Sequence, residues 1–259
     1  MIVELFGPPG VGKTTLAGAL ADRLRERGHG VKLVLSYRPA EYALASRAEG
    51  LARLHIPALR RLVRPLVESF AAADHSAESR EARAAAEMIR LLAPRNIVRS
   101  LKLRQYVLRL SRTWGGAALC GDIVLFDQGF IQAVCTFALV ARAADPERIA
   151  LALDAVPEPD LVVRLDAPLS ILETRLAERR RRQSRIEQLL DLDAATNLRS
   201  VWIFDQMHEL LRARGRPVIC VDSTDQRSLG KGLEKVERRM RRSPGKEPAG
   251  SSARRDGPG

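Results

Sequence analysis

Short apolar segments alternate along the chain with longer segments in which apolar and polar residues recur at helical spacing. The apolar segments have the length of strands and are rich in Val, Ile and Leu. They span residues 2–6, 31–36, 122–127, 161–166 and 217–222. Nearly continuous apolar strands separated by helices are typical of a parallel sheet that helices cover on both faces. The pattern therefore predicts an α/β fold.

Three of the predicted strands end in an aspartate: Asp127, Asp166 and Asp222. In an open α/β sheet, the carboxyl ends of the parallel strands form the edge at which ligands bind. We therefore expect these carboxylates at the functional edge of the sheet.

The helical segments differ in length and in how they end. Residues 13–27 predict one helix, which two nearby glycines terminate. Residues 40–113 contain no convincing strand, and three prolines interrupt their apolar spacing, so we expect three or four helices in a lateral subdomain. Residues 241–259 are polar and rich in Gly and Pro, which predicts a disordered basic tail behind a domain of residues 1–240.

The most specific motif lies between the first strand and the first helix. The segment GPPGVGKT at residues 7–14 matches the phosphate-loop pattern G-x-x-x-x-G-K-[ST] in its expected context. Glycines let backbone N–H groups curl around phosphate oxygens, Lys13 reaches the β- and γ-phosphates, and the Thr14 hydroxyl is a ligand for Mg²⁺. The residues expected to bind a nucleoside triphosphate are Gly7, Pro8, Pro9, Gly10, Val11, Gly12, Lys13, Thr14 and Thr15.

The strand that ends at Asp127 provides the second candidate group. In phosphate-loop proteins, an acid at the end of a neighbouring strand completes the Mg²⁺ shell or orients the phosphate acceptor. The structural alternative is that Asp127 caps the helix that follows it. We take Asp127 as a catalytic residue and, with Thr14, as a metal ligand.

Arginines are concentrated in the helical segment 171–182. Arg175, Arg179 and Arg182 share one helical face. Converging arginines can stabilise the charge of a transferring phosphoryl group. The alternative is a solvated basic helix or a nucleic-acid stripe, and we favour the solvated helix for Arg181 and Arg182.

The order of these motifs resembles the thymidylate kinase family within the nucleoside monophosphate kinases. The resemblance rests on the phosphate loop, GDIVLFDQG at 121–129, PDLVVRLDAPLSILETRLAERR from residue 159, SRIE at 184–187 and RPVICVD at 216–222. It implies a P-loop NTPase fold with a five-stranded parallel sheet flanked by helices, a lid at 168–190, and dependence on ATP and Mg²⁺. The implied reaction moves the γ-phosphate of ATP to a nucleoside monophosphate, with a dTMP-like acceptor as the best guess.

The resemblance also suggests particular residues and an assembly. Arg175 and Arg179 correspond to lid arginines, and Glu187 would order the segment behind them. A homodimer is a family expectation.

Two departures from the family lie near the expected acceptor. Gln128 follows Asp127 where the family has an arginine that grips the acceptor phosphate, and Pro9 stands where the family's loop commonly has an acid. A neutral amide cannot supply the missing charge. Arg38, in the segment SYRP, only echoes the family's T-R-E-P motif and is a candidate ligand of the acceptor phosphate.

The region 40–113 could replace the missing charge, because it is longer than in a minimal thymidylate kinase. Spacing favours Arg104 over its neighbours Arg95 and Arg99, although a solvated face is the simpler explanation for each. We therefore carry Arg38, Arg104 and Gln128 as candidate acceptor-binding residues.

Two other functions remain as alternatives. The first is a kinase for a hydroxyl group on a nucleoside, sugar or antibiotic. The second is an AAA+-type or regulatory ATPase that acts on a macromolecule, but Asp127 is not followed by the acid that would activate water. A GTPase is disfavoured because the chain has no Asn-Lys-x-Asp segment.

Charge and cysteine content complete the expectations. The formal net charge is +12, and the residues from Arg238 onward supply much of it. Bound ATP with a small acceptor is the simplest polyanionic partner, so nucleic acid is not expected. Three widely spaced cysteines indicate a reducing, cytoplasmic compartment, and no apolar run approaches the roughly 18 residues of a membrane span.

Overall fold

The computed structural model describes residues 1–35, 80–93, 97–141, 145–182 and 194–242. Five strands form one parallel sheet in the order β2-β3-β1-β4-β5. The strands are β1 (Ile2–Phe6), β2 (Val31–Val34), β3 (Ile123–Phe126), β4 (Leu161–Asp166) and β5 (Val218–Asp222). The predicted α/β fold with a five-stranded parallel sheet is thus confirmed, and residues 7–12 of the phosphate-loop motif connect β1 to the first helix.

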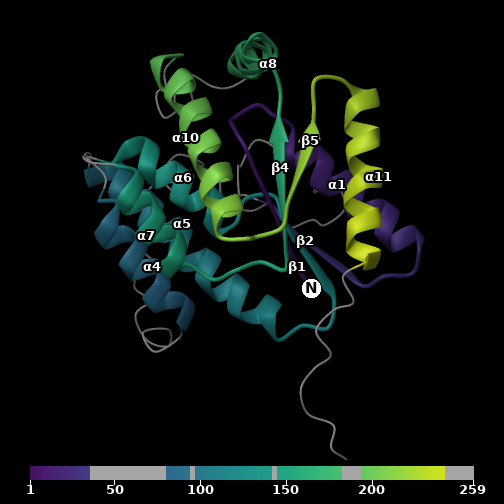
Figure 1. The fold of residues 1–259 in the computed structure, drawn as a ribbon, viewed down its shortest axis with the longest axis horizontal. Helices are drawn as coiled ribbons and strands as arrows, with labels where there is room; N and C mark the ends of the chain where they lie inside the picture. The colour runs from purple at the N-terminus through teal and green to yellow at the C-terminus, as the bar shows by residue number, and fades with distance from the viewer. Residues whose placement is uncertain (36–79, 94–96, 142–144, 183–193, 243–259) are drawn as a thin grey trace, which may run out of the picture.

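Helices cover both faces of this sheet (Figure 1). The described helices are α1 (Lys13–Glu26), α4 (Arg80–Leu91), α5 (Ile97–Ala118), α6 (Phe130–Val140), α7 (Pro146–Ala155), α8 (Leu169–Arg182), α10 (Ala194–Ala213) and α11 (Gln226–Arg242). Helices α1 and α11 pack on one face, and α4, α5, α6, α7 and α10 pack on the other. Among the described residues, no helix has both the length and the apolar content needed to cross a bilayer.

Alternation along β1 divides its side chains between these two cores. Val3 and Leu5 join the core on the α1 side, whereas Ile2 and Phe6 join the core on the α6 side. Glu4 lies between Ile2 and Phe6 in this alternation, so its side chain is directed toward α6. A carboxyl group thus enters the mainly apolar core on the α6 side.

The register of the parallel strands sets the functional edge of the sheet. Glu4 pairs with Phe126 of β3, and Phe6 pairs with Arg164 of β4. The phosphate loop, which begins directly after β1, therefore lies at the same edge of the sheet as the turn that begins at Asp127. Helix α8 lies beyond the end of β4 at this same edge (Figure 1).

Several boundaries differ from the predicted ones. Strand β2 ends at Val34, earlier than the predicted 31–36, and Leu35 beyond it is exposed. Helix α11 continues through Arg242, which lies in the predicted tail. Met240 anchors its last turn in the core, and the positive charges of the arginines in that turn interact favourably with the negative end of the helix dipole. Residues 243–259 lie outside the described residues.

The predicted subdomain at 40–113 is described only from residue 80. That part contains α4 and most of α5, with no strand among its described residues. The number of helices and the domain division therefore remain predictions.

Candidate active site

The phosphate loop ends in a helix N-terminus that no side chain caps. Gly12 is the N-cap residue of α1, has left-handed dihedral angles (φ 93°) and has no side-chain capping bond. A Cβ atom at Gly12 would meet nothing within 4 Å, so the space beside it is open. The first N–H groups of a helix have no acceptor within the helix, and together with the dipole they form a binding site for an anion.

Lys13 folds back over the loop that precedes it. Its Nζ donates to the carbonyl oxygens of Gly7 (2.7 Å) and Pro8 (3.1 Å), and the residue is buried. These contacts place a positive charge inside the curve of the loop. Their acceptors are neutral carbonyl groups, which a phosphate oxygen can replace with a stronger, charge-assisted bond.

The structure joins the two residues predicted to bind a metal. The Thr14 hydroxyl donates to Asp127 Oδ2 at 2.8 Å, although the residues are far apart in sequence. Asp127 is fully buried, and its backbone N–H donates to the Val34 carbonyl at 3.2 Å, which fixes the turn after β3.

The donor set of this pair fits Mg²⁺. A hydroxyl and a carboxylate are hard oxygen ligands, and Mg²⁺ completes its octahedral shell with water and phosphate oxygens. Within the described ranges, no group of three or more His, Cys, Asp or Glu side chains could hold a metal ion. A metal at Thr14 and Asp127 would therefore depend on ligands from a bound nucleotide.

The other two strand-end aspartates have different partners. Asp166 forms an ion pair with the buried guanidinium of Arg164 (3.1 Å), which also pairs with Asp205 of α10. Asp222 accepts hydrogen bonds from the hydroxyl (2.6 Å) and the backbone N–H (2.9 Å) of Thr224, and these bonds lower the pKa of Asp222. Of the three strand-end carboxylates, Asp127 is the one that reaches the phosphate loop.

The sequence analysis missed a series of buried hydrogen bonds that joins Glu4, Gln132 and Gly7 next to the phosphate loop, and we call this series the relay. Glu4 Oε1 accepts the backbone N–H of Gln132 (2.9 Å), and Gln132 Oε1 accepts the backbone N–H of Gly7 (3.1 Å). Burial raises the pKa of Glu4 from 4.5 to about 8, although backbone N–H groups at the start of α6 favour its charged form. The signal that could have identified this relay is an acid within the apolar strand IVELF.

On the expected acceptor side, the turn after Asp127 is held by a tyrosine. The Tyr106 hydroxyl donates to the Gln128 carbonyl at 3.1 Å. Burial, with the nearby carboxyls of Glu4 and Asp127, raises the pKa of Tyr106, so it remains a neutral donor. Gln128 is half-buried beside Asp127, and Arg104 on α5 is exposed. Arg38 and Arg95 lie outside the described residues.

Helix α8 contacts two loops at the edge of the sheet. Arg175 donates to the carbonyl oxygens of Ser223 (2.8 Å) and Thr224 (3.0 Å), in the connection between β5 and α11. The next residue, Leu176, lies so close to Gly10 that a Cβ atom at Gly10 would be 3.2 Å from Leu176 Cγ. Arg179 belongs to α8, but its side chain, like the whole of Glu187, lies outside what the structure describes.

Comparison with known proteins gives only distant likenesses. No protein-family model matches the chain, and no curated protein matches it. A solved structure of deoxyadenosine kinase from M. mycoides, with dCMP and dCDP bound, is 14% identical with a TM-score of 0.47, over 94% of this chain and 100% of that chain. Thymidylate kinase from Ehrlichia chaffeensis is 15% identical with a TM-score of 0.44, over 93% of this chain and 98% of that chain.

One more of the similar solved structures is also that of a kinase. A third structure, the M. mycoides deoxyadenosine kinase with bound dATP, is 13% identical with a TM-score of 0.46, over 93% of this chain and 100% of that chain. At such identity and TM-score, the ligands of those proteins do not carry over to this chain.

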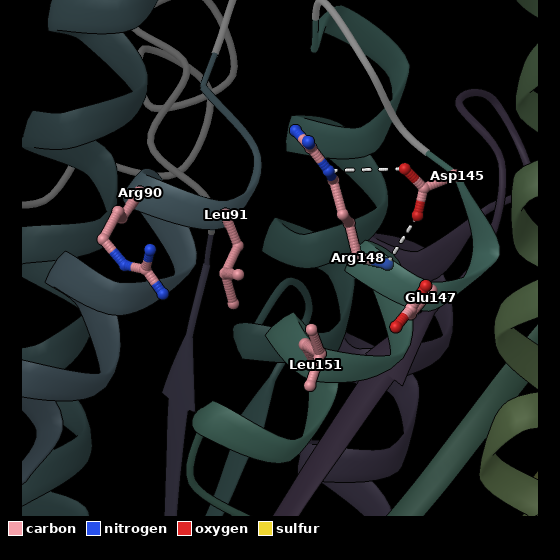
Figure 2. A pocket seen from close by; sticks show the side chains of 6 residues that line it. All are labelled: Arg90, Leu91, Asp145, Glu147, Arg148 and Leu151. Atoms are coloured by element: carbon pink, nitrogen blue, oxygen red, sulfur yellow. Dashed lines mark hydrogen bonds and ion pairs between the residues drawn. The ribbon is translucent and has the colours of Figure 1, made fainter.

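A cleft of about 430 Å³ lies between α4 and α7, apart from the candidate site residues (Figure 2). It is lined by Arg90, Leu91, Asp145, Glu147, Arg148 and Leu151. Asp145 caps α7 through the backbone N–H of Arg148 (2.8 Å) and pairs with the Arg148 guanidinium (3.3 Å), and Arg90 pairs with Glu87 (2.6 Å). Its charged groups thus stabilise the two helices, and it contains none of the predicted site residues.

Proposed function

We propose that the chain is an ATP-dependent phosphotransferase that moves the γ-phosphate of ATP to a small-molecule acceptor in the cytoplasm. The observation that supports this most directly is the hydrogen bond between Thr14 and Asp127. It joins the start of α1 to the strand-end acid, beside the Lys13 ammonium. A triphosphate bound at the N-terminus of α1 would therefore meet a cation and a pair of metal-binding oxygens.

The residues of the loop divide the work of phosphate binding. Pro8 and Pro9 have no backbone N–H, and the Gly7 N–H is bound to Gln132, so the N–H groups that would bind phosphate oxygens lie among residues 10–15. Lys13 would exchange the carbonyls of Gly7 and Pro8 for the β- and γ-phosphates. Thr14 and Asp127 would hold Mg²⁺, which when bound would offset the charge that develops on the γ-phosphate. Asp127, which is buried and fixed by its backbone bond to Val34, would also orient the acceptor.

Arg175 and Arg179 are proposed to stabilise the transferring phosphoryl group from α8. Arg175 must first leave the carbonyls of Ser223 and Thr224, because its guanidinium is bound to them in this structure. Closing α8 over the substrates would exclude water, which protects the γ-phosphate from hydrolysis. Arg179 lies four residues further along the same face and would approach with it.

The acceptor is a nucleoside monophosphate, with a dTMP-like molecule as the first choice on the sequence motifs. A second candidate is an uncharged acceptor, whose hydroxyl on a nucleoside, sugar or antibiotic receives the phosphate. Gln128 favours this second candidate, because the described turn presents a neutral amide beside Asp127. Arg38 and Arg104 are the proposed phosphate ligands if the acceptor is charged.

The decisive experiment measures ADP release by the purified full chain with MgATP and a panel of acceptors. Nucleoside monophosphates, nucleosides and aminoglycosides should separate the two acceptor classes, because only a true acceptor stimulates ADP release. ATP turnover that no small acceptor changes, but that DNA, RNA or protein stimulates, would support the ATPase alternative and contradict the kinase.

Lys13→Ala tests whether the loop takes part in this reaction. We expect at least a 10²-fold loss of turnover in a chain that still folds, because a charge aimed at the transferring phosphoryl group is lost. Lys231→Ala, at an exposed lysine of α11, is the matched control and should retain full activity. Equal activities of the two variants would remove the phosphate loop from the mechanism.

A further inference from the structure

The proposed mechanism gives no role to the carboxyl group that lies behind the phosphate loop. Glu4 is fully buried on β1, three residues before Gly7. Its Oε1 is bound to Gln132, whereas Oε2 has no hydrogen-bond partner among the residues that the structure describes. Burying a carboxyl group in an apolar core is costly, so a fold that retains one needs a reason for it.

Gln132 connects this carboxyl group to the phosphate loop. It lies in the first turn of α6, is 6% exposed, and receives the Gly7 N–H at its side-chain oxygen. The carbonyl oxygen of Gly7 in turn accepts the Lys13 ammonium at 2.7 Å. Gly7 is therefore held on its N–H side by Gln132 and on its C=O side by Lys13.

Glu4 also contacts the turn that carries Asp127. A Cβ atom at Gly129 would lie 2.4 Å from Glu4 Cδ and 2.5 Å from Oε2. The φ of Gly129 is −111°, which any residue can adopt, so the close approach of Glu4 is what excludes a side chain here. The same carboxyl group thus packs under the turn after Asp127 and binds the helix that holds Gly7.

We propose that Glu4 and Gln132 are positioning residues that fix the phosphate loop relative to the Asp127 turn before a triphosphate binds. The inference rests on the proposed function, because a fixed loop matters for an anion that the loop receives. A loop held by buried hydrogen bonds has less conformational freedom to lose on binding, so affinity rises without any added contact to the ligand. Neither residue needs to touch the nucleotide for this effect.

The test compares the full-length wild type with variants that remove one link of the relay. Gln132→Leu keeps the size of the side chain but removes the acceptor for the Gly7 N–H. Glu4→Leu removes the acceptor for the Gln132 N–H, whereas Glu4→Gln retains an oxygen that can accept it. Ser111→Ala is the control, because Ser111 is a buried residue of α5 whose hydroxyl binds the carbonyls of Val107 and Glu81, away from the loop.

Two readouts separate positioning from general stability. The first is amide hydrogen exchange, without nucleotide, in peptides that cover residues 4–16. The second is the dissociation constant of MgATP, measured by titration calorimetry. In Gln132→Leu and Glu4→Leu, we expect the amide hydrogens of these peptides to exchange about tenfold faster, because each variant leaves a buried N–H group without its acceptor. Both variants should also bind MgATP about tenfold more weakly.

Recovery by the conservative variant completes the expectation. Glu4→Gln should bind MgATP within about threefold of the wild type, and Ser111→Ala should change neither readout while lowering the melting temperature. Unchanged exchange in residues 4–16 of Gln132→Leu, or an increase spread over the whole chain as in a destabilised control, would overturn the proposal. If the Leu variant does not fold, Gln132→Asn, whose oxygen is withdrawn by one methylene, carries the same expectation.

The two readouts also separate this inference from the proposed function. A wild type that does not bind MgATP contradicts the proposed function, whereas the exchange measurement still decides whether Glu4 and Gln132 hold the loop. Normal MgATP binding by both Leu variants contradicts the positioning role and leaves the phosphotransferase intact.

Discussion

The phosphate loop and helix α8 lie against each other at the carboxyl edge of the sheet, but different kinds of contact hold them. The loop is fixed by hydrogen bonds among the buried groups of Gly7, Lys13 and Gln132. The polar contact that holds helix α8 is made by the half-buried Arg175, whose guanidinium donates to the backbone carbonyls of Ser223 and Thr224. Buried polar groups are costly to leave unpaired, whereas water can replace a partner at an accessible one. The loop is thus held by buried polar contacts, and we expect α8, whose polar contacts water can replace, to be the element that moves in the proposed closure.

The largest expected effect concerns the carboxylate on the rigid side of this comparison. Asp127→Asn keeps the size of the side chain but removes a negative charge beside Thr14, so kcat/KM for MgATP should fall by about 10²- to 10³-fold. Asp166→Asn is the matched control, because Asp166 ends the neighbouring β4 and pairs with Arg164 instead. Steady-state kinetics should show less than about a threefold change for this control. Similar losses in both variants would mean that the Thr14 contact does not distinguish Asp127.

The cost of the buried carboxyl group can be measured through its pH dependence. The pKa of Glu4 is about 8 in the folded protein, against an ordinary value of 4.5. Between these values the folded state keeps a proton that the unfolded chain has released, so the free energy of unfolding falls as the pH rises from about 4.5 to 8.

Glu4→Gln removes this contribution. The wild type loses this contribution as the pH rises, whereas the variant has no such group to titrate. The difference in unfolding free energy between variant and wild type should therefore shift in favour of the variant by on the order of a few kcal/mol from pH 5 to pH 9. Chemical denaturation of both proteins across this range is the measurement. A difference between them that does not change with pH would contradict a raised pKa for Glu4.

On the mobile side we expect a smaller effect. Arg175→Ala should lower kcat about tenfold while leaving the affinity for ATP nearly unchanged, because its proposed contact forms in the transition state. Arg181→Ala, at an exposed position of the same helix, should change kcat by less than about twofold. If Arg175→Ala instead lowered the affinity for ATP as much as it lowered kcat, Arg175 would contribute to binding ATP in the ground state.

The sequence alone was sufficient for the frame of the fold and for two candidate groups that the structure brings together, Thr14 and Asp127. Apolar strand segments that alternate with helical segments predicted the parallel sheet, and the phosphate-loop motif could be located because its glycines, lysine and threonine are close together in the chain. Asp127 was predictable because it ends a strand, and strand ends meet at one edge. Which of the three aspartates would reach the loop depended on the strand order, and the residues alone do not specify that order.

The contacts that the sequence did not predict join groups whose chemistry gives no local signal. Gln132 could bind almost any backbone N–H, and nothing in the chain marks Gly7 as its partner. The acceptors of Arg175 are backbone carbonyls, which every residue has. Arg164 lies within an apolar strand, and nothing in the chain marks Asp205, on the distant helix α10, as its partner.

The two tryptophans of the chain lie in opposite environments, which gives the protein a built-in optical reporter. Trp114 is 2% exposed and packs between the rings of Phe126 and Phe130, at centroid distances of 4.9 and 5.3 Å, on either side of the Asp127 turn. Trp202 on α10 is 45% exposed. Replacing Trp202 with phenylalanine would leave one indole emitter beside the candidate site. Its fluorescence would then follow events at Asp127 in an unlabelled protein, without a coupled enzyme.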